Sequence, residues 1–172
     1  ISEKMLFDER SSKIIHINSI NIILEHSLMS IAKWEAKYNI PFIHSKEKTN
    51  EQMYDYISMM CITKNVNSNV FRTLSTKELK EITDYLNAPM TATTIGKQKN
   101  SKHSNEIYTA EVIYYYMIKH GIPFECQKWH INRLMMLINV CSLKDNPTKM
   151  DKQEQYKMQR ELNEKRLKEA GL

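Results

Sequence analysis

The stretch EIYTAEVIYYYMIKHGIPFECQKWHINRLMMLINVC, residues 106–141, decides the fold because it predicts two helices that are too apolar to lie on a surface. Residues 106–120 are apolar nearly all round, which is typical of a buried central helix. Gly121 follows where a left-handed residue ends a helix, and Pro123 prevents its continuation. A second long helix is expected over about 125–141. Its inward-facing residues are Trp129, Leu134, Met135, Leu137, Ile138 and Cys141. We expect this pair to form the heart of the core.

Two capping boxes mark the starts of further helices. Thr49 pairs with Gln52, and Ser75 pairs with Glu78, so that each pair satisfies amide groups that a helix start leaves unpaired. Helices are therefore expected over about 50–64 and 75–87. The second ends at the sequence Asn-Ala-Pro because the residue before a proline avoids the helical conformation.

The N-terminal part combines two patterns. Residues 27–38 repeat apolar side chains at helical spacing and stop before Pro41, which predicts another helix. Residues 13–24 nearly alternate apolar and polar side chains and are rich in isoleucine, which favours one or two short strands. We therefore expect a mainly α fold, a compact multi-helix domain with a short N-terminal β element.

The last part of the chain differs in character from the rest. Residues 148–172 are rich in Lys, Glu and Gln and carry only a thin apolar stripe of Tyr156, Met158, Leu162 and Leu167. We expect a helical globular domain over 1–147, followed by a polar, extended amphipathic C-terminal helix or tail over 148–172 that is suited to docking on a partner. The polar residues 94–105 are expected to form a mobile loop, because they bury too little surface to offset their ordering entropy.

The composition fits one soluble domain of ordinary size. The chain has 172 residues, of which 41% are hydrophobic and 26% charged, and no window approaches the roughly 18 apolar residues of a spanning helix. We expect neither a membrane span nor a signal peptide. The net charge of +5 is interspersed along the chain, so nucleic acid is a secondary hypothesis. With three glycines, neither a P-loop nor a Rossmann fingerprint can be assembled.

One spacing invites a chemical interpretation. Cys126 and His130 would lie one turn apart on a helix, as in a metal site or a nucleophile–base pair, but no second such pair is present and core packing is favoured. Cys61 and Cys141 are isolated in apolar stretches, which favours reduced, buried thiols. The remaining histidines show no metal-binding spacing, and solvated or capping roles are expected for them: His16, His26, His44, His103 and His120.

The acidic residues lie near lysines and are expected to form solvated ion pairs: Asp8, Glu9, Glu35, Glu47 and Glu51. The lysines of the 97–103 segment are expected to be solvated, without the interleaved aromatic side chains that stack on bases. No residue is therefore nominated as catalytic, cofactor-binding or metal-binding. Eleven methionines offer either an adaptable apolar binding surface, at Met53, Met59, Met60, Met135 and Met136, or a mere coding bias, and both interpretations stay open.

Three segments resemble a known family. AKWEAKYNIPF (32–42), NAPMTATTI (87–95) and FECQKWHINRLMMLINVC (124–141), with KEKT at 46–49, are similar to small tailed-bacteriophage proteins commonly labelled tail assembly chaperones. The likeness spans roughly residues 28–145. The ending, ELNEKRLKEAGL, alternates in charge where relatives finish in an Arg-rich run, which argues against a phosphate-binding tail.

The resemblance implies a non-enzymatic assembly factor without a cofactor. Such a factor binds the tape-measure protein and recruits tail-tube subunits in the host cytoplasm during tail morphogenesis, and self-association is a further expectation. The alternative is a structural component retained in the virion, such as a head–tail connector or a tail part. A nucleic-acid-binding regulator is a third class, and its affinity would fall steeply with salt.

Overall fold

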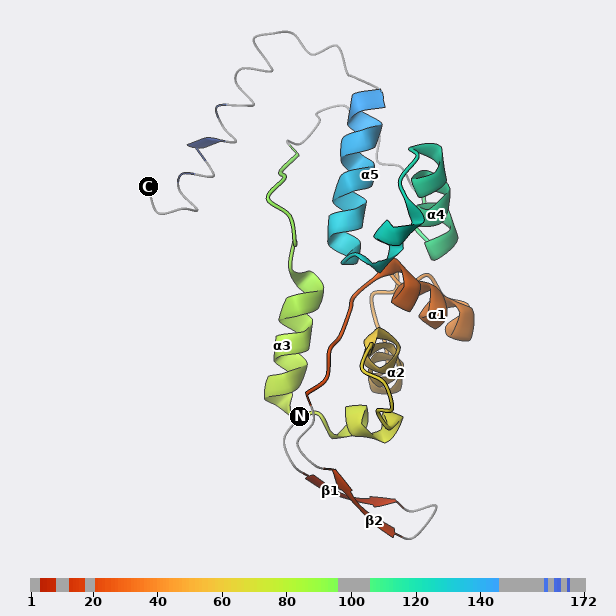
Figure 1. Ribbon diagram of the computed structural model, residues 1–172, viewed down its shortest axis with the longest axis vertical. Coiled ribbons are helices and arrows are strands. Elements are labelled where there is room, and N and C mark those ends of the chain that lie inside the picture. The colour runs from red at the N-terminus through yellow and green to blue at the C-terminus, as the bar shows by residue number, and fades with distance from the viewer. Residues whose placement is uncertain are drawn as a thin grey trace.

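The computed structural model describes residues 21–95 and 106–145, the backbone of 4–8 and 13–17, and four isolated helical positions, Arg160, Asn163, Glu164 and Leu167. The chain is mainly α. Its helices are α1 (Leu28–Tyr38), α2 (Asn50–Met60), α3 (Thr76–Asn87), α4 (Ala110–Lys119) and α5 (Ile131–Asp145), with 3-10 turns η1 (Ser68–Thr73) and η2 (Phe124–Lys128) (Figure 1). None of the described helices is long and apolar enough to cross a membrane.

Both predicted capping boxes are confirmed. The Thr49 hydroxyl accepts the Gln52 N–H while the Gln52 side chain accepts the Thr49 N–H, and α2 begins there. Ser75 and Glu78 do the same for α3. A third box, between Ser27 and Ser30, opens α1 and was not predicted, because Ser30 replaces the usual Glu or Gln.

Two helix ends differ from the predictions. Helix α2 ends at Met60 instead of residue 64, because Cys61 pairs with Leu24 in an isolated antiparallel bridge. Helix α4 starts at Ala110, where the Thr109 hydroxyl caps it, rather than at residue 106. At its other end, Gly121 has a φ of 63°, the left-handed conformation expected there.

The helix predicted over about 125–141 is confirmed from Ile131 onward, but its predicted start is wrong. Residues 124–128 form η2, the chain is extended at Trp129 and His130, and α5 begins only at Ile131. The break has a tertiary cause: the Ile131 N–H donates to the carbonyl of His26, 2.8 Å away, and His130 bridges to Ser27. An apolar pattern contains no signal for these distant partners.

The strands are also placed differently. Strand β2 (Lys13–Ile17) pairs antiparallel with β1 (Lys4–Asp8), which lies outside the predicted 13–24 region. Residues 21–25 run as an extended segment between α3 and α2, with one bridge at Leu24 (Figure 1). The loop expected at 94–105 lies outside the described residues except for Thr94 and Ile95, and so does the 148–172 tail with its boundary, apart from the four positions named above.

The core is centred on α1. Leu28, Ile31 and Trp34 are fully buried, and side chains from α2, α4 and α5 pack on them: Tyr56, Met60, Ala110, Ile113, Met117, Leu134 and Ile138. The predicted pair α4 and α5 therefore shares the core with α1 instead of forming its centre. Helix α4 is not buried all round, because Tyr115 and Ile118 are 58% and 65% exposed.

Glu35 of α1 is buried, contrary to the expectation of a solvated ion pair. One carboxylate oxygen accepts the Phe42 N–H and the other accepts the Ala110 N–H, each at 2.7 Å. Ala110 opens α4, so the carboxylate sits at the positive end of that helix. A single side chain thus fixes α1, the loop after it and the start of α4.

We predict that Glu35→Gln destabilises the protein by about 2 kcal/mol, because an amide offers one acceptor where the site presents two donors and one N–H stays unpaired. This corresponds to a loss of roughly 4–8 °C in Tm, measured by circular dichroism. Glu47→Gln, at an exposed position, is the matched control and should leave Tm unchanged. An equal Tm for both variants would contradict the assigned role.

Candidate functional site

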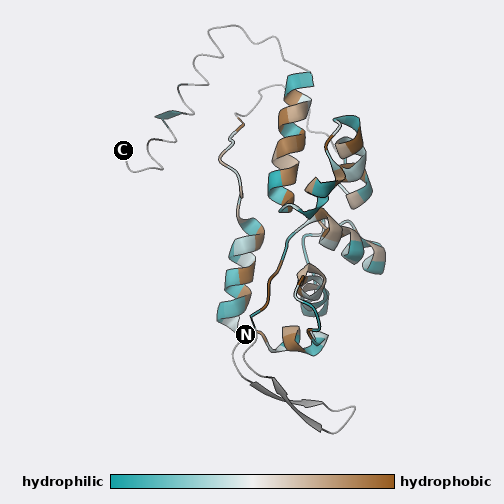
Figure 2. Cartoon of the chain, in the orientation of Figure 1, coloured by the Kyte–Doolittle hydropathy of each residue, from teal (hydrophilic) through white to brown (hydrophobic). Residues whose placement is uncertain are grey.

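Helix α3 packs more loosely than the other helices. It is amphipathic, with hydrophilic and hydrophobic positions alternating along its ribbon (Figure 2), yet none of its residues is buried. Its apolar side chains are partly buried: Leu79, Ile82, Tyr85 and Leu86. Its C-terminal end is held by the residues around the start of α5. The Asn132 side-chain amide donates to the carbonyls of Leu86 and Ala88 at 3.2 and 2.8 Å, and Nε2 of His130 lies 3.0 Å from the carbonyl of Tyr85.

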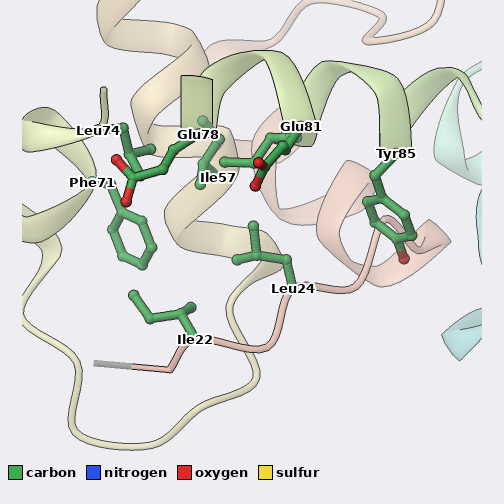
Figure 3. Close-up of a pocket in the computed structure, with 9 residues that line it drawn as sticks. Ile22, Leu24, Ile57, Phe71, Leu74, Glu78, Glu81 and Tyr85 are labelled. Carbon is green, nitrogen blue, oxygen red and sulfur yellow. The ribbon is translucent and has the colours of Figure 1, made fainter. Parts of the chain in front are cut away.

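A cleft of about 280 Å³ lies between α3 and the body of the protein. Its wall is apolar and is formed by Ile22, Leu24, Ile57, Phe71, Leu74 and Ile82, with Tyr85 at one end. Figure 3 shows the side chains of Ile22 and Leu24 pointing from the extended segment toward α3. Two carboxylates, Glu78 and Glu81, line the α3 side. We call this site the α3 cleft.

Tyr85 connects the cleft with a buried cluster of polar rings. Its hydroxyl accepts the His26 N–H at 3.3 Å, and its ring lies edge-on to His130 at 4.9 Å. The rings of His26 and His130 are also 4.9 Å apart. Behind them, the Tyr56 hydroxyl lies within hydrogen-bond distance of Nδ1 of His26 and 3.3 Å from the Ser30 hydroxyl. The solvated role expected for His26 is therefore wrong.

Burial determines the protonation of this cluster. It lowers the pKa of His26 to about 3, with a smaller contribution from the neighbouring His130, and it lowers the pKa of His130 as well. Burial also raises the pKa of the Tyr56 hydroxyl. All three groups are therefore uncharged near neutral pH, and they act as a hydrogen-bonded support for Tyr85.

The Cys126 and His130 pair does not share a helix face, because the chain changes from η2 to an extended conformation between them. Cys126 is 6% exposed and belongs to the core cluster, as core packing predicts, whereas His130 contacts Tyr85 and His26. Within 21–95, 106–145 and the isolated positions, no three His, Cys, Asp or Glu side chains are grouped so as to hold a metal ion. The three cysteines are free thiols, and Cys61 and Cys141 are half-buried.

The structure brings together three residues that the sequence does not link. Nδ1 of His120 lies 2.7 Å from Asp145, and its Nε2 lies 3.0 Å from the Ser142 hydroxyl. This order resembles a hydrolase triad, but Ser142 lies inside α5, where its own N–H is bonded within the helix and cannot stabilise an oxyanion. We interpret the group as a link between the ends of α4 and α5. Of the two roles expected for His120, the solvated one is wrong, because its side chain is 3% exposed, and the capping one fits, because His120 is the C-cap residue of α4.

The five methionines considered for an apolar binding surface are not exposed. Met60 is buried, and Met53, Met59, Met135 and Met136 are half-buried, so these residues fill the core and its margins. Among the carboxylates expected to be solvated, Glu51 is exposed and lies 3.2 Å from Arg72. The lysines at 97–103 and His103 lie outside the described residues, as do the side chains of Asp8, Glu9 and His16.

Comparison of this chain with protein-family models, with curated proteins and with solved structures gives no match. The function proposed below therefore rests on the α3 cleft and on the sequence resemblance.

We predict that acidification destabilises the protein. His26 binds a proton in the unfolded chain near pH 6.5 but not in the folded chain until about pH 3, so the unfolded state is favoured as pH falls through this range. The loss between pH 7 and pH 5 is about 2 kcal/mol, measured by urea unfolding. His26→Asn, whose side-chain carbonyl can accept a hydrogen bond from the Tyr56 hydroxyl, should reduce this loss of stability. His44→Asn, at an exposed site, should leave it unchanged. Equal losses of stability in the unmodified protein and in both variants would contradict the prediction.

Proposed function

We propose that this protein is a non-enzymatic phage assembly factor whose α3 cleft binds apolar side chains of another tail protein. The partner is the tape-measure or tail-tube protein, and binding takes place in the host cytoplasm during tail morphogenesis. The observation that carries the proposal is an open apolar cleft between the body of the protein and α3, a helix that buries none of its own residues. The resemblance of residues 32–42, 87–95 and 124–141 to phage tail assembly chaperones supports the biological setting.

The energetics of the cleft favour a protein partner. Fully burying one Val, Leu or Ile side chain contributes about 1.5–3 kcal/mol, so two inserted side chains contribute about 3–6 kcal/mol before ordering costs. The partly exposed side chains of Ile82 and Tyr85, which line the cleft, gain further burial when it is filled. Anchors of this kind, in a pocket with a polar edge, carry most of the affinity in protein interfaces.

The polar groups near the cleft support a binding role. The imidazoles of His26 and His130 are buried, and their lowered pKa values keep them neutral. Each hydrogen-bonds to a neighbouring part of the chain, so their task is to hold Tyr85 and the end of α3. A rigid support behind a loosely packed helix is what a site for inserted side chains requires.

We predict that Ile82→Gln weakens binding to the tape-measure protein about ten-fold, because it replaces an apolar wall of the cleft and costs about 1.4 kcal/mol. Isothermal titration with the purified tape-measure protein measures the change. Thr83→Gln, one residue along α3 and exposed, is the matched control and should bind as the unmodified chain does. Equal affinities for the two variants would place the binding surface elsewhere.

A chain ending at Lys149 should bind the same partner with unchanged affinity, because it keeps the whole α3 cleft. Loss of binding would identify residues 150–172 as the binding element and would contradict the cleft proposal.

Mass spectrometry of purified phage particles supplies a second check. Abundant peptides of this chain in mature virions would replace the transient factor by a structural component.

A further inference from the structure

The extended segment 21–25 has one edge that pairs with the chain after α2 and a second edge that, at Ile22 and Leu24, no described residue pairs with. On the paired side, the Ile62 N–H donates to the carbonyl of Ile23 at 3.0 Å, and the Glu25 N–H donates to the carbonyl of Met60 at 2.9 Å. Leu24 therefore sits opposite Cys61 as a non-hydrogen-bonded antiparallel pair. In such a pair the backbone N–H and C=O point away from the neighbouring strand. The backbone N–H and C=O of Leu24 therefore face the other edge. The same groups of Ile22, two residues earlier, face it as well.

The chain itself uses this second edge, but only at its far end. The carbonyl of His26 accepts the Ile131 N–H at 2.8 Å, and the His26 N–H donates to the Tyr85 hydroxyl. Toward the N-terminus the pairing stops. No described residue hydrogen-bonds to the backbone of Ile22 or Leu24. The unpaired edge thus continues a strand pairing that the protein already makes.

The side chains along this edge alternate as in a strand. Ile22 and Leu24 line the α3 cleft, whereas Ile23 is 62% exposed on the opposite face. An added strand would place every second side chain on the same side as Ile22 and Leu24, which is the side of the cleft. Its main chain would supply the missing hydrogen bonds. A helix satisfies its own main chain and would leave the edge unpaired, so the edge favours an extended occupant.

Charge specifies the occupant further. Glu81 is exposed at the cleft, and Glu78, which also caps α3 through Ser75, lies one turn before it. The lysines of α3, Lys77 and Lys80, are exposed and are not among the residues that line the cleft. Glu81 therefore presents negative charge beside an apolar wall. Lysine or arginine next to alternating apolar residues complements this pattern.

We infer that an extended, lysine- or arginine-flanked segment of the partner adds as a β-strand to the edge at Ile22 and Leu24, with alternate apolar side chains in the α3 cleft. The inference rests on the proposed function, because it names how the same cleft is occupied. It adds backbone pairing and charge as the basis of recognition, which the proposed function leaves unspecified.

The test uses the full chain and a synthetic probe, a peptide with alternating valine and threonine between a pair of lysines at each end. Amide hydrogen exchange is followed by NMR as the peptide is titrated. The exchange of Ile22 and Leu24 should slow about ten-fold, as expected for 1.4 kcal/mol of added protection, while Ile23, already bonded to Thr63, changes little. Protection spread over α3 without any at Ile22 and Leu24 would overturn strand addition.

Matched variants separate backbone pairing from charge. Ile22→Pro removes the backbone N–H of residue 22 that faces the edge, so it should weaken peptide binding about ten-fold. Ile22→Val keeps this N–H and should bind the peptide as the unmodified protein does. Glu81→Lys should weaken binding, and Asp84→Lys, the same charge change at an exposed site outside the cleft, should not. If Ile22→Pro does not fold, a peptide N-methylated at the residues that face the edge tests the same bonds on the intact protein. Normal binding of that peptide would overturn the inference.

The inference and the proposed function fail in different ways. If the tape-measure protein binds through Ile82 but leaves the amides of Ile22 and Leu24 unprotected, strand addition is wrong and the proposed function stands. If neither Ile82→Gln nor Glu81→Lys changes binding of the tape-measure protein, the cleft is not its site and the proposed function is wrong.

Discussion

The buried carboxylate of Glu35 is the interaction on which the rest of the structure depends. Each of its oxygens accepts one backbone N–H, from Phe42 and from Ala110, so three parts of the chain meet at one side chain. Holding the Phe42 N–H places its ring against Trp34 and Tyr56, at centroid distances of 5.1 and 4.1 Å. A buried charge costs several kcal/mol unless its oxygens are bonded, so the site tolerates few alternatives.

Hydrogen bonds from side chains to distant backbone groups also hold α3 in place. Side chains of Asn132 and His130 bind carbonyls at the end of that helix, as Glu35 binds amides at the start of another. Glu35, His130 and Asn132 thus hold helix ends in a fixed frame through backbone groups that lie far away in the sequence. The α3 cleft is the part of the molecule that this frame leaves open.

An open apolar cleft and an unpaired strand edge are each costly for a protein that acts alone. Unpaired edges promote association with other chains, and apolar clefts promote unwanted contacts. Here the two lie side by side, and Glu81 places charge at the cleft. Ile23 is exposed on the other face of this segment, and so is Ile62, which follows α2 and hydrogen-bonds to Ile23, so exposed apolar side chains lie on both faces of the 22–25 region. Such an arrangement is consistent with a surface that is covered in a complex.

The sequence by itself determined the local features of this protein. The boxes at Thr49 and Ser75, the left-handed Gly121 and the mainly α composition depend on residues within about one helical turn, so a linear pattern contains them. The tertiary structure decided the break before α5, the burial of Glu35 and the α3 cleft. Glu35 and Ala110 are 75 residues apart, and their contact exists only once the helices have packed. Partners brought together by folding leave no periodic signal in the sequence, which is why the cleft and its edge could not be predicted from it.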